Sequence, residues 1–185
     1  IHIGANIGQE IPYYRKLDIP VLYFEPLEEI YNKLLENMIG SKNIKAEKLA
    51  VGSEDKELII YESTKQGVSS SILEPKDHLK VFPERKFKET RCNQVKLDTY
   101  FLTNPCVYNT LVIDIQGYEY FALQGAVNTL KNIDYLLLEV WYKPLYNDTP
   151  LKDEIDLFLE ENFREVNHIP VNDYFGNALY ERISL

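Results

Sequence analysis

Residues 1–10, with the sequence IHIGANIGQE, begin with a short apolar run that breaks into a loop containing Gly4 and Gly8. Glycine can adopt a positive φ, and without a Cβ it lets another group come close to the backbone. We therefore expect this loop to bring bare backbone against a ligand. Position 6 is Asn, so the loop lacks the G-x-G-x-x-G spacing of a dinucleotide-binding site.

The composition predicts one globular domain over residues 1–185. Hydrophobic residues make up 45% of the chain and charged residues 26%, which is ordinary for a protein with a packed core. The formal net charge of −9 argues against a nucleic-acid partner. We expect the most basic stretch, residues 84–91 (ERKFKETR), to be an exposed loop.

Three further features concern the cellular setting. No apolar run reaches the roughly 18 residues that a membrane span needs. The two cysteines, Cys92 and Cys106, form no C-x-x-C pair, which favours reduced thiols and a cytoplasmic location. The chain starts without Met, and we expect a segment leading into the first strand to be missing.

Apolar strand patterns alternate with helical patterns along most of the chain. Strands are expected at residues 1–5, 19–25, 43–52, 57–62, 95–101, 110–115, 133–142, 165–170 and 177–184. Helices are expected at residues 7–17, 26–39, 118–130 and 151–163. This alternation predicts an α/β fold with a mostly parallel sheet and helices on both faces. Only a short polar turn separates the last two strands, so we expect them to pair as an antiparallel hairpin.

Polar residues follow two further strands of the predicted sheet. Glu25 and Pro26 follow the second strand, and Asp114 ends a later central strand. Ligands of open α/β sheets bind beyond these carboxyl ends, and a carboxylate at Glu25 can accept hydrogen bonds from both ribose hydroxyls of a nucleoside. The alternative is an acid at the N-terminus of the next helix. A carboxylate kept for a ligand would have no strong partner in the empty protein.

Segments along the whole chain resemble the FkbM-type methyltransferase family, which uses S-adenosylmethionine (SAM). In chain order they are IHIGANIGQE, YFEP, AVGSED, VKLDTYF, VIDIQGYEYFALQGA, LLLEV with PLY, and FGNALYE. The IDIQGYE segment, residues 113–119, is the most specific of them. The resemblance implies a Rossmann-like, seven-stranded SAM-dependent methyltransferase fold. It also implies methyl transfer to a hydroxyl oxygen, with a sugar, glycan or glycolipid as the acceptor.

The resemblance also implies roles for individual residues. The residues that it assigns to SAM are Gly4, Ala5, Asn6, Gly8, Glu25, Pro26 and Asp114. The loop would wrap the methionine part, Glu25 would hold the ribose, and Asp114 would lie near the sulfonium. His2 departs from the family, which has an acidic residue there, so the ammonium of SAM has lost a partner or is held differently. We expect His2 to be an ordinary strand histidine.

Three acids are candidates for a general base: Asp114, Glu119 and Glu139. Each has a structural alternative. Asp114 could accept a hydrogen bond from the backbone of the turn at Gly117, and Glu119 could be an acid in the first turn of a helix. Glu139, if buried, would need a partner or a ligand. Positioning of the reactants, with effective molarities of about 10⁵–10⁸ M, outweighs the roughly 10²–10⁴-fold effect of a base. Ser69, Ser70 and Ser71 could face the pocket or form a polar loop. No group of residues has metal-ligand spacing, so no metal is predicted.

Two other classes of function stay open. One is a SAM-binding or nucleoside-binding module without catalysis, which the loss of the acid at His2 favours. The other is an NAD(P)-dependent Rossmann oxidoreductase with a degenerate glycine loop. Binding of SAM without turnover would indicate the first, and binding of NAD(P) in place of SAM would indicate the second.

Overall fold

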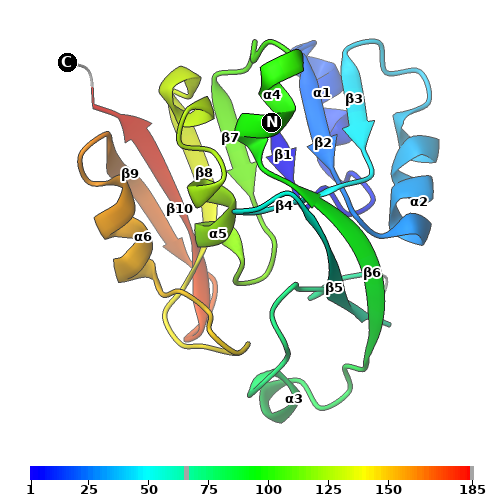
Figure 1. The fold of residues 1–185 in the computed structure, drawn as a ribbon, viewed down its shortest axis with the longest axis vertical. Coiled ribbons are helices and arrows are strands. Elements are labelled where there is room, and N and C mark those ends of the chain that lie inside the picture. The colour runs from blue at the N-terminus through cyan, green and yellow to red at the C-terminus, as the bar shows by residue number, and fades with distance from the viewer. Residues whose placement is uncertain (65–66, 184–185) are drawn as a thin grey trace.

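Two β-sheets organise the chain in the computed structural model, which describes residues 1–64 and 67–183 (Figure 1). The larger sheet has seven strands in the order β3-β2-β1-β7-β8-β10-β9, and the smaller has the order β4-β6-β5. In the larger sheet β10 is antiparallel to both of its neighbours, and the other pairs are parallel.

The helices and strands have the following bounds. The larger sheet consists of β1 (His2–Ile3), β2 (Val21–Phe24), β3 (Ile44–Glu47), β7 (Thr110–Ile113), β8 (Tyr135–Trp141), β9 (Phe163–Pro170) and β10 (Phe175–Arg182). The smaller sheet consists of β4 (Ala50–Val51), β5 (Lys56–Ser63) and β6 (Phe87–Val95). The helices are α1 (Ile11–Leu17), α2 (Glu28–Met38), α3 (His78–Val81), α4 (Leu97–Thr103), α5 (Glu119–Gln124), the 3₁₀ helix η1 (Thr129–Asn132) and α6 (Lys152–Leu159).

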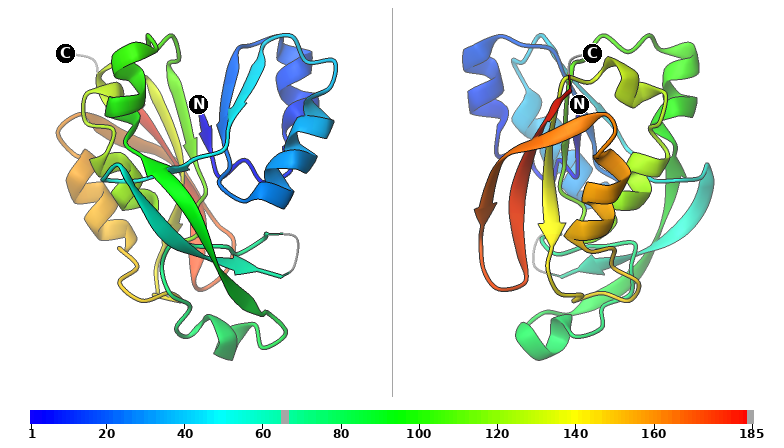
Figure 2. Two further views of the ribbon diagram at one scale, coloured as in Figure 1. Left: turned by 45° about the vertical axis from the view of Figure 1, so that its right-hand side comes forward. Right: turned by 90° about the vertical axis from the view of Figure 1, so that its left-hand side faces the viewer.

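Helices cover both faces of the larger sheet. On β2 the side chains alternate between two cores, since successive residues of a strand point to opposite faces. Leu22 and Phe24 pack in a core that contains residues of α4, α5 and α6, whereas Val21 and Tyr23 pack against α1 and α2. Figure 2 shows α5 and α6 on one side of the sheet and α1 on the other. This arrangement confirms the predicted α/β, Rossmann-like fold with a mostly parallel sheet.

The C-terminal hairpin is confirmed. β9 and β10 pair antiparallel, with Gly176 opposite Pro170 and Arg182 opposite Phe163. The prediction placed the second strand at residues 177–184, of which residue 184 lies outside the described part of the chain. β10 also pairs with β8, so the hairpin extends the parallel sheet.

The strand predicted at residues 95–101 is wrong. Only Val95 belongs to a strand, and Leu97–Thr103 form α4. Tertiary contacts stabilise this helix, because Leu97 is fully buried and the Asp98 carboxylate accepts hydrogen bonds from the backbone N–H groups of Asn128 and Thr129. A local pattern of apolar and β-branched residues does not contain these contacts.

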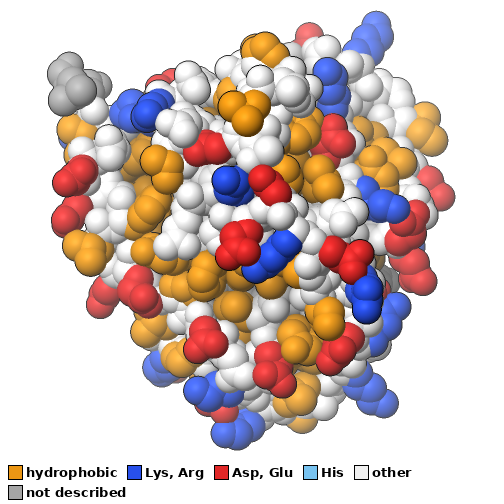
Figure 3. Space-filling model, viewed as in Figure 1, with side chains coloured by type: hydrophobic (Ala, Val, Ile, Leu, Met, Phe, Trp, Pro, Cys, Tyr) orange, Lys and Arg blue, Asp and Glu red, His pale blue; other side chains and the backbone are white. Residues whose placement is uncertain are grey.

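The basic stretch at residues 84–91 is also different from its prediction. Its second half lies in β6, where Lys88 pairs with Glu62 and Arg91 pairs with Glu57, both on β5. Figure 3 shows acidic and basic side chains interleaved over this face of the molecule. These cations are therefore neutralised across the strands of the smaller sheet.

Two other observations bear on the expected cellular setting. Cys92 and Cys106 are both free thiols. Among the described residues, none of the helices has the length and the apolar character that crossing a membrane requires.

Candidate functional site

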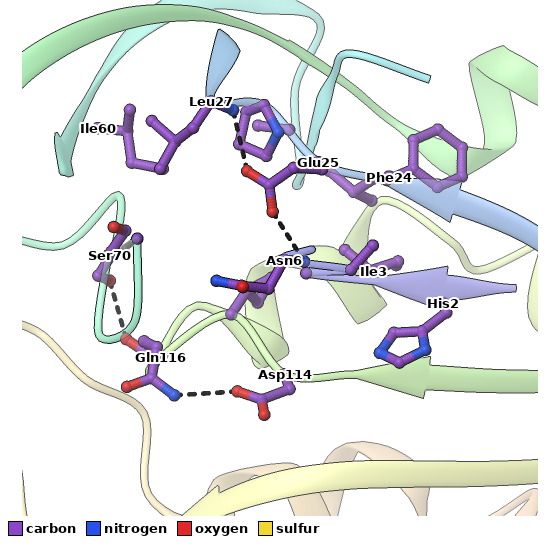
Figure 4. Close-up of a pocket in the computed structure, with 18 of the residues that line it drawn as sticks. His2, Ile3, Asn6, Phe24, Glu25, Leu27, Ile60, Ser70, Asp114 and Gln116 are labelled. Atoms are coloured by element: carbon purple, nitrogen blue, oxygen red, sulfur yellow. Dashed lines mark hydrogen bonds between the residues drawn. The ribbon is translucent and has the colours of Figure 1, made fainter. Parts of the chain in front are cut away.

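A cavity of about 300 Å³ lies where β1, β2 and β7 end. The order of the larger sheet reverses between β1 and β7, and this is where ligands of open α/β sheets bind. The segment at residues 67–72, which follows β5, covers the cavity from the side of the smaller sheet. The structure thus brings the glycine loop, Glu25 and Asp114 into one pocket (Figure 4).

The two glycines of the loop serve the packing of the chain. Gly4 has φ +82°, and a Cβ there would lie 1.9 Å from the carbonyl oxygen of Asp114. Gly8 has φ +77°, and a Cβ there would overlap Ile11 and Leu34. The absent side chains therefore make room for neighbouring protein atoms, whereas the sequence led us to expect room for a ligand.

The loop residues differ in their exposure to the pocket. Gly4, Ala5 and Asn6 line it, but Gly8 is not among the lining residues. Asn6 has φ +46°, a left-handed conformation that Asn tolerates better than most residues. The loop thus turns its first half towards the pocket and its second half towards α1 and α2.

Glu25 closes the end of β2 with two hydrogen bonds. One carboxylate oxygen accepts from the backbone N–H of Asn6 at 3.0 Å, and the other accepts from that of Leu27 at 2.9 Å. The side chain is buried, and burial raises the pKa of the carboxyl to about 7 although both N–H donors oppose this rise. Glu25 therefore has strong partners in the protein itself, which corrects the expectation that it would have none.

The wall beside Glu25 is apolar. Pro26 and Leu27 line the pocket there, and Leu49, Val51 and Ile60 add apolar side chains from the smaller sheet and the segment before it. A flat, apolar group could pack in this part of the pocket while Glu25 accepts from a neighbouring polar group. The smaller sheet, which the sequence did not indicate, supplies part of this wall.

Asp114 is joined to Glu139 through one amide group. The side-chain nitrogen Nε2 of Gln116 donates to Oδ1 of Asp114 at 2.9 Å and to Oε2 of Glu139 at 2.9 Å. Asp114 and Gln116 line the pocket, whereas Glu139 does not. Gln116 belongs to the IDIQGYE segment, but the sequence did not indicate that its amide holds two acids together.

Glu119 holds the turn after β7. Its Oε1 accepts from the backbone N–H of Ile115 at 2.9 Å and from that of Gly117 at 3.2 Å. Glu119 is buried outside the pocket lining. The turn at Gly117 is thus bound by Glu119, and not by Asp114 as one alternative had it.

Three acids meet at the wall of the pocket to which Asp114 contributes. Oxygen atoms of Asp114, Glu119 and Glu139 all lie within 4.8 Å of one another. Desolvation by the surrounding protein raises the pKa of all three carboxyls, although Asp114 is still exposed to the pocket, and the charge of Asp114 raises the pKa of the other two further. Such a group could share a cation, a possibility that sequence spacing did not reveal, or could share protons. That no metal is required stays a prediction.

Within residues 1–64 and 67–183, His2 forms no ion pair. Burial lowers the pKa of its imidazole to about 4, so the ring is neutral at pH 7. Its Nδ1 lies 3.3 Å from the Tyr14 hydroxyl, and the ring packs against Tyr23 with 5.3 Å between centroids. His2 lines the pocket as a neutral group, in agreement with an ordinary strand histidine.

The serine run lies in the segment that covers the pocket. Ser69, Ser70 and Ser71 line it, and the Ser71 hydroxyl donates to the Gln116 carbonyl at 2.8 Å. The Tyr146 hydroxyl donates to the Ser69 carbonyl at 2.9 Å. Tyr146 belongs to the PLY segment of the resemblance, but no role for this residue was predicted from the sequence.

Solved structures with a similar fold include several methyltransferases. Magnesium protoporphyrin IX methyltransferase from Synechocystis with bound SAM has a TM-score of 0.57 and 9% identity over 98% of this chain and 68% of that one. Fibrillarin from Aeropyrum pernix with SAM has a TM-score of 0.56 and 9% identity over 97% and 64%. An rRNA methylase from Streptococcus thermophilus has a TM-score of 0.54 and 10% identity over 99% and 86%. At such identities the likeness is one of fold.

The sequence itself places the chain in a family. A search of curated proteins finds no match. The family model of the methyltransferase FkbM domain, however, matches residues 2–166, which is most of the chain. The protein therefore belongs to the methyltransferase FkbM domain family and has the fold of SAM-dependent methyltransferases.

Proposed function

We propose that the pocket binds SAM and that the protein transfers the methyl group to a hydroxyl oxygen, with a sugar of a glycan or glycolipid as acceptor. One observation carries this proposal. Glu10, Glu25 and Asp114 line the pocket, and none of its described lining residues is Lys or Arg. SAM carries a sulfonium and an ammonium and suits an acidic pocket, whereas the pyrophosphate of NAD would meet three acidic side chains and no Lys or Arg among the described lining residues.

The nucleoside fits the end of the pocket at Glu25. The Glu25 carboxylate keeps acceptor capacity beyond its two backbone bonds, and the ribose hydroxyls would use it. The adenine would pack against Pro26, Leu27 and Ile60 on the apolar wall. Asp114, which closes the opposite wall, would then face the sulfonium.

The residues of this chain position the reactants and accept the proton of the acceptor hydroxyl. When bound, SAM supplies an electrophilic methyl group on a positively charged sulfur. The acceptor oxygen forms a bond to this carbon while the carbon–sulfur bond breaks and sulfur keeps the electron pair. Asp114 receives the hydroxyl proton, and the Gln116 amide keeps its carboxylate in place. Most of the rate comes from holding the two reactants in line.

Calorimetry with SAM, S-adenosylhomocysteine and NAD tests the cofactor. We expect SAM and S-adenosylhomocysteine to bind and NAD to show no heat of binding. Binding of NAD together with no binding of SAM would contradict the proposal and favour an oxidoreductase.

Methyl transfer is tested with radiolabelled SAM and a panel of hydroxyl acceptors that contains free sugars, glycans and glycolipids. We expect transfer to a sugar hydroxyl, and a lower kcat in Asp114→Asn with SAM affinity reduced far less. Tight SAM binding without transfer to any acceptor would favour a binding module without catalysis.

A further inference from the structure

Glu10 is an acidic residue of the pocket that has no cationic partner in the described part of the chain. It precedes α1, directly after the glycine loop, and its side chain lines the pocket. Its Oε2 is buried and has no hydrogen-bond partner. Among the described residues no Lys, Arg or His forms an ion pair with it, and burial followed by the charge of Asp114 raises the pKa of its carboxyl. The side chain is half-buried and its carboxylate accepts from the backbone N–H of Glu10 itself, but Oε2 has lost water without gaining a partner, which is costly unless a ligand supplies one.

Glu10 and Glu25 line the same pocket but have different neighbours. Glu25 is bound to Asn6 and Leu27, beside the apolar wall. Glu10 is close enough to Asp114 for their charges to interact, and it lies near Tyr14 and Tyr23 beneath the loop. With the nucleoside at Glu25, the amino-acid part of SAM would extend towards the neighbouring acids Glu10 and Asp114.

We propose that the Glu10 carboxylate binds the ammonium group of the methionine part of SAM. This inference rests on the proposed function. The neighbouring His2 is neutral and offers no negative charge to an ammonium. Asp114 already accepts from Gln116, which uses part of its acceptor capacity. At Glu10, by contrast, the ammonium would supply the hydrogen-bond partner that Oε2 lacks.

If Glu10 binds the ammonium, a substitution at Glu10 should affect ligand affinity and the stability of the ligand-free protein differently. In the ligand-free protein Glu10 contributes a poorly solvated charge, so Glu10→Gln, which has the same shape, should fold with an unchanged or higher Tm. The same variant should bind the ammonium less well. A residue with a purely structural role would not lower affinity while the Tm holds.

A comparison of two ligands isolates the contribution of the ammonium group to binding. S-adenosylhomocysteine and 5′-methylthioadenosine both carry adenosine and a neutral thioether, but only the first has the amino-acid part. In calorimetry, Glu10→Gln should weaken S-adenosylhomocysteine roughly tenfold to a hundredfold, as expected for a charge-assisted hydrogen bond, and leave 5′-methylthioadenosine within about twofold. The exposed Glu161→Gln is the matched control and should change neither affinity.

Other outcomes would overturn the inference. An equal loss for both ligands would mean that Glu10 shapes the loop, and a loss for SAM alone would mean that it faces the sulfonium. Unchanged binding of S-adenosylhomocysteine would exclude any contact with the ammonium. In these three cases the wild type still binds SAM and the proposed function stands. If the wild type binds none of these ligands, the proposed function fails and this inference fails with it.

Discussion

The Glu25 carboxylate accepts the backbone N–H of Asn6 at 3.0 Å, and this bond ties the end of β2 to the loop after β1. The second carboxylate oxygen accepts the N–H of Leu27, just before α2. One side chain therefore holds together two of the three strand ends that form the pocket. A group in this position contributes to folding and to ligand binding at once.

Glu25→Ala should lower both stability and SAM affinity. The change leaves two N–H groups without their acceptor, and each unsatisfied buried donor costs about 1–3 kcal/mol. We expect the free energy of unfolding to fall by about 2–4 kcal/mol, since water can enter part of the space. SAM affinity should fall roughly tenfold to a hundredfold through loss of the ribose contact. Urea denaturation and calorimetry on the same variant measure the two effects.

The matched variant is Glu25→Gln. Its amide oxygen can still accept one of the two backbone N–H groups, so it should lose less stability than Glu25→Ala. A Glu25→Ala protein as stable as the wild type would contradict the two hydrogen bonds. Full SAM affinity in that variant would remove the ribose contact from the proposal.

The regular elements of the larger sheet could be predicted because their signals are local. The runs that form β7 and β8 are nearly continuous in apolar residues, which is typical of central parallel strands. The smaller sheet was harder to predict from the sequence, because β6 is mostly polar and has only two buried residues, Cys92 and Gln94. Its pairing with β5 depends on contacts between segments far apart in the sequence.

The site could be predicted at the level of strand ends and not at the level of contacts. Spacing alone placed Glu25 and Asp114 beside the glycine loop. The partners of Glu119, by contrast, are backbone groups of Ile115 and Gly117, whose direction depends on a turn with positive φ values. Glu10 gave no signal either, because an acid before a helix is common on protein surfaces.

Gly4→Ala should prevent stable folding. Its Cβ would lie 1.9 Å from a backbone carbonyl oxygen, that of Asp114, which cannot move without shifting β7. We expect a loss of at least about 4 kcal/mol in the free energy of unfolding, which is among the largest effects of single substitutions.

Gly40→Ala is the control for Gly4→Ala. Gly40 has a similar φ of +84°, but nothing lies within 4 Å of its missing Cβ. This variant should lose only the conformational cost of about 1–2 kcal/mol. Similar Tm values for the two variants would show that the steric overlap at Gly4 is relieved.

Tyr146→Phe should weaken SAM binding through the segment that covers the pocket. The Tyr146 hydroxyl donates to the carbonyl of Ser69, a lining residue with a left-handed φ of +70°. Without this bond the segment should leave its strained conformation more often, and we expect affinity to fall about fivefold, equivalent to roughly 1 kcal/mol. Tyr180→Phe, which removes the hydroxyl bonded to Asp156 in α6, should cost stability and leave affinity unchanged. Equal affinities in both variants would contradict a role for Ser69.

The group of three acids, Asp114, Glu119 and Glu139, should make the stability of the protein depend on pH. The variant Glu139→Gln isolates the contribution of Glu139. Burial, and then the charges of Asp114 and Glu119, raise the pKa of Glu139 well above the usual 4.5. As the pH rises above about 4.5, the unfolded chain releases this proton while the folded protein keeps it, so the free energy of unfolding falls with rising pH, by up to about 1.4 kcal/mol per pH unit. Gln cannot ionise, and subtraction of its curve removes the titrations that both proteins share, including those of His2 and His78. Urea denaturation between pH 5 and 8 should therefore show wild type losing stability relative to Glu139→Gln. Parallel curves would mean that Glu139 is ionised throughout this range in the folded protein.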